Sequence, residues 1–204
     1  PAILYTRSAM PRRARQPAGQ IVYHVLNRGN LRAKLFHKDA DYQAFERVLE
    51  QAMQRTPVDL FSWCLMPNHW HLVLRPRRGE DLSELMRWLT VTHTQLWRAH
   101  SHSHGAGHLY QGRYKSFPVQ SDESFVTVCR YVERNALAAG LVERAEKWQW
   151  SSLWRRMHGA AEESDILAPW PVERPRGWVA TVNRPLRPRE AAQGVTEVNL
   201  LEWS

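Results

Sequence analysis

The sequence predicts an α+β fold of the ferredoxin-like class, in which two helices cover one face of an antiparallel sheet. Three observations indicate this class. Over 20–27 the set Ile21, Tyr23 and Val25 alternates with the set Val22, His24 and Leu26. Segments 39–55 and 81–100 carry apolar stripes at helical spacing, and a tight turn at 67–68 joins two apolar runs. In chain order the segments read strand, helix, strand, strand, helix, strand, which is the split βαβ pattern.

The first half of this pattern has clear boundaries. The first strand ends at Gly29, and Asp39 begins a helix that ends at Thr56–Pro57, because the residue before a proline avoids helical angles. The second strand covers 60–66, and the turn and third strand cover 67–74. These last two strands are therefore expected to pair as a hairpin.

The second half repeats the helix and strand and then adds a helix. The helix over 81–100 is followed by an extended segment over 110–119, in which Pro118 indicates an edge strand. Another amphipathic helix begins at Asp122 and ends at Gly140, a residue typical of helix C-termini. In a ferredoxin-like fold, the sheet face away from the first two helices is open to this further helix and to a site.

The sequence divides into three parts by composition. Residues 1–19 form a basic arm with little periodicity, residues 20–158 hold the predicted elements, and residues 159–204 are rich in Pro, Arg and Glu. We expect one domain over 20–158, a flexible arm before it and an irregular tail after it.

Charge favours a polyanionic partner. Lys and Arg total 28 against 20 Asp and Glu, a net charge of +8, and ten tryptophans offer surfaces for base stacking. The alternative is an inert basic surface over a core rich in Trp. No apolar run is long enough to span a membrane, and no signal peptide is visible. Cys64 and Cys129 lie in apolar runs, so we expect them to be reduced thiols. Together these features predict a cytoplasmic, nucleoid-associated protein.

Paired histidines on the third strand are the first candidate site. His69 and His71 flank one apolar residue, so they share a strand face and form a possible pair of metal ligands. About half an H-x-H is expected by chance from ten histidines, so the spacing alone is weak. Two further H-x-H pairs within 100–104 lie in a Gly-rich loop and read as surface. Alternatively, the strand pair is simply hydrogen-bonded on a sheet face.

The last core helix supplies a possible nucleophile and a third ligand. Tyr131 and Asn135 lie one helical turn apart and therefore project from the same face. If this helix packs beside His69 and His71, two imidazoles and an amide oxygen form a ligand set suited to Mg²⁺ or Mn²⁺. Zinc is the alternative, although zinc sites more often add a thiolate, a third imidazole or a carboxylate.

Three segments in this order resemble the IS200-type single-tyrosine transposases, and more narrowly the REP-associated tyrosine transposases. They are residues 66–71, which match the HUH motif, residues 111–116 and residues 131–135 followed by 140–142. The resemblance covers roughly residues 11–156. The family has proline after the asparagine of the third segment, where this chain has Ala136.

The resemblance implies a reaction and its residues. In such enzymes the histidine pair, here His69 and His71, holds a divalent metal that polarises a phosphate of single-stranded DNA, with Asn135 as third ligand. Tyr131 would attack phosphorus and leave a 5′-phosphotyrosine and a free 3′-OH. The expected substrates are palindromic repeats that form DNA hairpins. The related insertion-sequence transposases exchange helices in dimers, but for this chain a monomer is favoured over a homodimer.

Other residues are candidate DNA contacts or alternatives. His24 is either a partner of the metal ligands or a core residue, and His93 reads as structural. Tyr110 and Tyr114 are weaker candidate nucleophiles than Tyr131, because neither has an amide or imidazole four residues later. The candidate DNA contacts are the arm residues Arg12, Arg13 and Arg15 and the strand residues Arg113, Tyr114 and Lys115.

Two other functions are alternatives. One is a non-catalytic DNA-hairpin-binding protein domesticated from a transposase, and the other is a plain metal-dependent nuclease or phosphohydrolase. The second function would not need Tyr131 as a nucleophile.

Overall fold

A computed structural model describes residues 21–101, 107–159 and 166–186 of the chain. Their strands and α-helices follow one another along the chain as β1 Tyr23–Arg28, α1 Asp39–Arg55, β2 Val58–Met66, β3 His69–Pro76, α2 Asp81–Ser101, β4 Lys115–Pro118, α3 Asp122–Ala138, α4 Ser152–His158 and α5 Trp178–Asn183. Short 3₁₀ turns occupy Asn30–Arg32 and Ala145–Lys147. No helix among the described residues is both long and apolar enough to cross a bilayer. The arm residues Arg12, Arg13 and Arg15 lie outside the described ranges.

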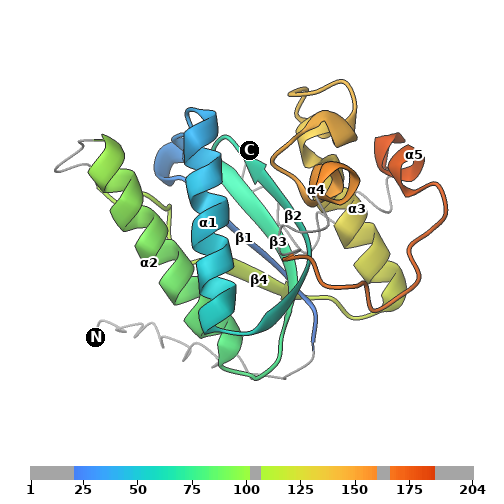
Figure 1. Cartoon of the computed structure of the whole chain (residues 1–204), viewed down its shortest axis with the longest axis horizontal. Coiled ribbons are helices and arrows are strands. Elements are labelled where there is room, and N and C mark those ends of the chain that lie inside the picture. Colours follow the sequence, from blue (N-terminus) through green and yellow to red (C-terminus); the bar gives the residue numbers. More distant parts are fainter. Residues whose placement is uncertain (1–20, 102–106, 160–165, 187–204) are drawn as a thin grey trace, which may run out of the picture.

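The four strands form one antiparallel sheet in the order β2-β3-β1-β4. This order and the two helices α1 and α2 lying side by side on one face confirm the predicted α+β, ferredoxin-like class (Figure 1). Strand β3 is an interior strand with a neighbour on each side, so its backbone is held along its length.

One face of β3 is apolar and packs into the larger core. Trp70, Leu72 and Leu74 are fully buried among side chains of α1 and α2. The alternation of a strand then directs His69 and His71 to the opposite face. Their register partners on β1 are Arg28 and Leu26, which therefore share that second face.

Helix α3 covers the second face of the sheet. Its N-cap is Ser121, whose side chain accepts a hydrogen bond from the Ser124 backbone N–H at 3.2 Å. Its buried apolar side chains pack on β2 and β3 and form a second core with members of both strands: Phe61, Cys64, Met66, Val73, Phe125, Val128, Cys129, Val132 and Ala136.

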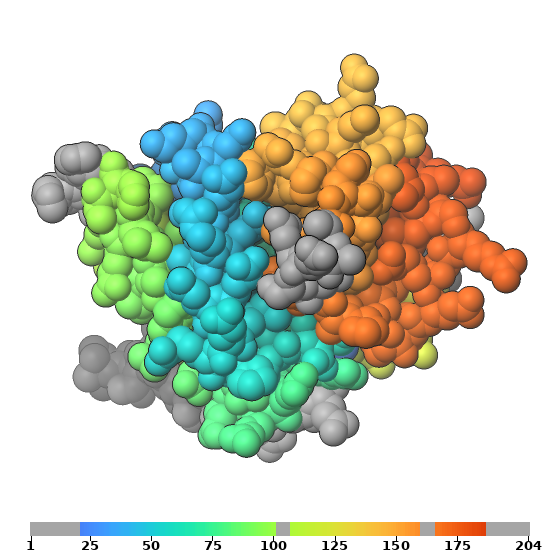
Figure 2. All heavy atoms as spheres, viewed as in Figure 1, coloured from blue at the N-terminus to red at the C-terminus, as the bar shows by residue number. Residues whose placement is uncertain are grey.

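The segment 166–186 packs on the outer side of α3, whereas the sequence predicted only an irregular tail after residue 158. Trp178 and Val182 of α5 are buried in the second core. Arg130 of α3 donates to the Thr181 carbonyl at 2.9 Å, and Arg134 donates to the Asn183 carbonyl at 3.0 Å. Figure 2 shows this segment, in deep orange, at the end of the molecule away from the green α2.

A buried carboxylate on α3 connects this helix to three other elements. Glu133 of α3 accepts hydrogen bonds from Ser152 of α4 at 2.7 Å and from the Trp178 indole of α5 at 2.6 Å. Ser62 of β2 donates to the same carboxylate at 3.4 Å. Burial raises the pKa of Glu133, and the donors oppose that rise by stabilising the charged form.

We expect Glu133→Ala to lower the free energy of unfolding by about 3 kcal/mol, because it leaves buried donors without an acceptor. Urea denaturation of this variant measures the loss. Glu143→Ala, which removes an exposed carboxylate just beyond α3, should change stability by less than about 0.5 kcal/mol. Equal stability of the two variants would show that the Glu133 network is not structural.

A second buried polar group lies in the larger core. His93 of α2 is 3% exposed, and its Nδ1 is 2.6 Å from the Tyr110 hydroxyl, which also accepts from the Trp70 indole at 3.2 Å. Burial lowers the pKa of His93 to about 4. The folded protein therefore favours the neutral form of the His93 imidazole.

This burial predicts an acid-sensitive stability. Unfolding exposes His93 and restores its ordinary pKa near 6.5, so the unfolded chain binds more protons and stability falls as the pH drops from 6.5 toward 4. In His93→Gln the slope of unfolding free energy against pH over this range should be smaller, whereas His100→Gln, an exposed change on the same helix, should keep the full slope. Denaturation at several pH values measures both, and an unchanged slope in His93→Gln would contradict the prediction.

Candidate active site

The site lies where β3 meets α3 on the second face of the sheet. His71 is 2% exposed, and its Nε2 is 3.2 Å from Nδ2 of Asn135. The His69 ring lies edge-on to the His71 ring, with centroids 5.0 Å apart. Tyr131 also presents its ring perpendicular to His71, at 5.7 Å between centroids. The structure therefore brings together the four residues that the sequence singled out.

Neighbouring groups hold both imidazoles in one tautomer. The Asn135 amide nitrogen can only donate, so Nε2 of His71 accepts, and its Nδ1 donates to Nε2 of His24 at 3.0 Å. Nδ1 of His69 lies 2.7 Å from the Asn68 side-chain oxygen and donates to it. Each Nε2 therefore carries a lone pair, which is the form that binds a metal.

Burial controls the charge of these groups. It lowers the pKa of His69 to about 4, with a further contribution from the cationic Arg28, and it lowers the pKa of His71 well below its usual value. Both imidazoles are consequently neutral at physiological pH. The same desolvation raises the pKa of Tyr131, and a hydrogen bond from Asn135 partly opposes this rise. The phenol is thus protonated before any reaction.

The donor set fits a divalent ion. Two neutral imidazoles of β3 supply nitrogen donors, and the Asn135 amide of α3 supplies an oxygen donor. Within the described residues no group of three His, Cys, Asp or Glu side chains is arranged to hold a metal.

Three residues at the site were missed or left open by sequence reasoning. His24 is fully buried and contacts His71, so it supports the candidate ligand rather than acting only as core. Asn68 was read as a turn residue, yet it contacts His69. Arg28 lies opposite His69 in the β1–β3 register, and only that pairing, which no local pattern reveals, identifies it.

The candidate DNA contacts separate in the structure. Lys115 of β4 is the register partner of Leu26 on β1, and Leu26 is the register partner of His71 on β3. Lys115 therefore lies on the same sheet face as the histidines, two strands away. Arg113 is exposed before β4. Tyr114 and Tyr110 are each 8% exposed and belong to the larger core against α2, which places both away from the histidine pair.

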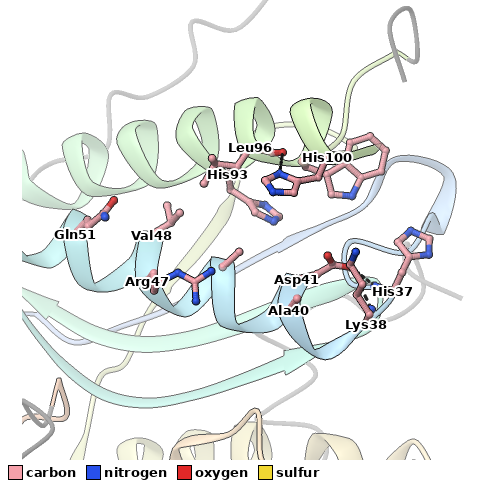
Figure 3. A pocket seen from close by; sticks show the side chains of 12 residues that line it. His37, Lys38, Ala40, Asp41, Arg47, Val48, Gln51, His93, Leu96 and His100 are labelled. Atoms are coloured by element: carbon pink, nitrogen blue, oxygen red, sulfur yellow. Dashed lines mark hydrogen bonds between the residues drawn. The ribbon is translucent and has the colours of Figure 1, made fainter. Parts of the chain in front are cut away.

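A pocket of about 570 Å³ lies between α1 and α2, lined by side chains such as His93, Trp97 and Arg47 (Figure 3). None of its lining residues belongs to the candidate site. His100 at its rim is exposed and contacts the Leu96 carbonyl of its own helix, and the other members of the 100–104 H-x-H pairs lie outside the described ranges.

Comparisons of sequence and structure identify proteins that this chain resembles. A REP-associated tyrosine transposase from Escherichia coli K12 is 20% identical over 134 residues, which cover 65% of this chain and 76% of that protein. A solved structure of a REP-associated tyrosine transposase bound to a REP hairpin covers 80% of this chain and 92% of its own, at 19% identity and a TM-score of 0.60, so it shares the fold. The model of the family "Transposase IS200 like" matches residues 18–135, more than half of the sequence, and the chain therefore belongs to the IS200-like transposase family.

Proposed function

We propose that the protein is a metal-dependent endonuclease and strand transferase that cuts and rejoins single-stranded DNA at palindromic, REP-like hairpins. The observation that carries the proposal is the position of Tyr131, whose ring meets His71 at 5.7 Å while Asn135 on the same helix contacts that histidine. A phenol beside two unprotonated imidazole nitrogens suits attack on a phosphate held at the same place.

The residues have distinct roles in this proposal. His69, His71 and Asn135 would hold Mg²⁺ or Mn²⁺, which when bound supplies positive charge to the scissile phosphate. His24 and Asn68 keep the two imidazoles in the ligating tautomer. Arg28, beside His69, adds a guanidinium that can contact a phosphate oxygen.

The chemistry is a transesterification. The Tyr131 oxygen forms a bond to phosphorus as the bond from phosphorus to the 3′ oxygen breaks. The phenolic proton leaves to solvent, and the departing oxygen gains a proton to give a free 3′-OH. One phosphodiester is exchanged for one phosphotyrosine ester, so a 3′-OH can later reverse the step and reseal DNA without ATP. We propose that the site is completed within a monomer.

Tyr131→Phe should abolish a covalent protein–DNA adduct, because it removes the attacking oxygen. The protein is incubated with a labelled hairpin oligonucleotide and Mn²⁺, and the products are separated on a denaturing SDS gel. Tyr42→Phe is the matched control, since it removes the hydroxyl of a buried tyrosine in the larger core, away from the candidate site and the candidate DNA contacts, and should leave the adduct intact.

The same gel distinguishes the two rival functions. Cleavage that persists in Tyr131→Phe without an adduct would indicate a plain metal-dependent nuclease. Tight hairpin binding by the unaltered protein with no cleavage at all would indicate a non-catalytic binding protein.

Metal binding is testable without DNA. Mn²⁺ at 100 times its Kd should stabilise the fold by about 2.7 kcal/mol, and His69→Ala with His71→Ala should remove the associated rise in Tm. His93→Gln, distant from the site, should keep the rise. Because burial holds the pKa of His69 at about 4, protons should compete with Mn²⁺ only as the pH approaches that value. A rise in Tm that survives the double substitution would contradict the ligand assignment.

A further inference from the structure

A groove lies on the face of the sheet that α1 and α2 cover, between α2 and the segment that leads into β4. It encloses about 910 Å³ and is lined along α2 by Arg87, Val91, Thr94 and Arg98, and across from them by Arg113. Neither the candidate site nor its chemistry uses this groove.

The walls of the groove are cationic. Arg87, Arg98 and Arg113 are exposed, and no acidic side chain occurs among its described lining residues. Arg98 donates from one guanidinium nitrogen to the Gly107 carbonyl at 3.3 Å, which orients the group at the rim. Arg87 and Arg98 are three helical turns apart on one helix face, a span of about 16 Å, which matches a few nucleotides of extended strand.

The floor of the groove is apolar. Met86, Leu109, Tyr110 and Tyr114 lie beneath the rim and are at most 8% exposed, while Val91 at the edge is 50% exposed. A cationic rim around an apolar floor suits a strand whose bases are unpaired, because its phosphates can meet the arginines while the bases turn inward. A duplex stem presents its phosphates outward and keeps its bases stacked, so it would leave the floor unused.

The groove approaches the candidate active site along β1. Asn27 lines the groove, and its neighbour Arg28 pairs in register with His69 on the other face. The backbone N–H of Gln111, another lining residue, donates to the Arg28 carbonyl at 2.9 Å. A strand leaving the scissile phosphate at His69 can therefore pass around this end of the sheet into the groove.

We propose that this groove binds the single-stranded DNA that flanks the hairpin next to the cleaved bond. The proposal rests on the function proposed above and adds the surface that holds one part of its substrate. It assigns Arg87, Arg98 and Arg113 to the phosphates of the flank, and it assigns the stem to another part of the protein.

Binding of fluorescent oligonucleotides without divalent metal tests the proposal, with fluorescence anisotropy as the readout. The probes are a palindromic hairpin alone and the same hairpin with a single-stranded 5′ or 3′ flank. The triple variant Arg87→Gln, Arg98→Gln, Arg113→Gln should bind one flanked probe at least about 10-fold more weakly, with the slope of log K against log salt reduced by about 2. Its affinity for the hairpin alone should change less than about 2-fold.

A control variant removes the same charge elsewhere. Lys34→Gln, Arg47→Gln, Arg176→Gln alters three exposed cations that do not line the groove, and it should retain binding to the flanked probes. Equal weakening in both triple variants, equal weakening for both kinds of probe, or no weakening would each overturn the proposal.

A cross-link gives an independent measurement on a protein with its arginines intact. Cys64 and Cys129 are fully buried, so a cysteine introduced as Thr94→Cys is the reactive thiol among the described residues. It should form a disulfide with a thiol-tethered nucleotide in the flank and not with one in the stem, and the reverse pattern would overturn the proposal. Neither test requires cleavage, so binding of the flank without a Tyr131 adduct would refute the proposed function and leave this inference standing.

Discussion

The alternation of side chains along β3 is the constraint on which the rest of the molecule depends. Trp70, Leu72 and Leu74 must face α1 and α2 to complete the larger core, and this burial fixes the direction of the residues between them. A slip of one residue in register would turn Trp70, Leu72 and Leu74 toward α3 and turn the histidines into the larger core. The stability of the core therefore directs His69 and His71 to one face of an interior strand.

Helix α3 then serves both packing and chemistry. Its apolar stripe fills the second core, and the flanking positions place Tyr131 and Asn135 over the histidines. On its other side, Arg130, Glu133 and Arg134 bind the segment 166–186, so the helix is held from both directions. The resulting desolvation lowers the pKa values of the histidines and raises that of Tyr131, which favours free imidazole lone pairs and a protonated phenol.

Much of the fold could be predicted from the spacing of apolar residues and from the residues that begin helices and form turns. The helices beginning at Asp39, Asp81 and Asp122 start where they were predicted, and the hairpin turns at Pro67–Asn68. The helix α5 was not predicted, because it is only six residues long and its stability comes from Trp178 and Val182 packing on α3 rather than from local propensity. The contact between Asn68 and His69 was not predicted, because a residue in a turn has no periodic pattern that indicates where its side chain points.

The sequence by itself determined which residues share a face: His69 with His71 on a strand, and Tyr131 with Asn135 on a helix. These relations follow from the repeat of a single backbone conformation over a few residues. Only the tertiary structure decided that the two faces meet, that His24 and Arg28 join them, and that the C-terminal segment supports the helix. His71 and Asn135 are 64 positions apart, and His24 and His71 are 47 apart, so their contacts depend on sheet order and core packing that no local pattern specifies.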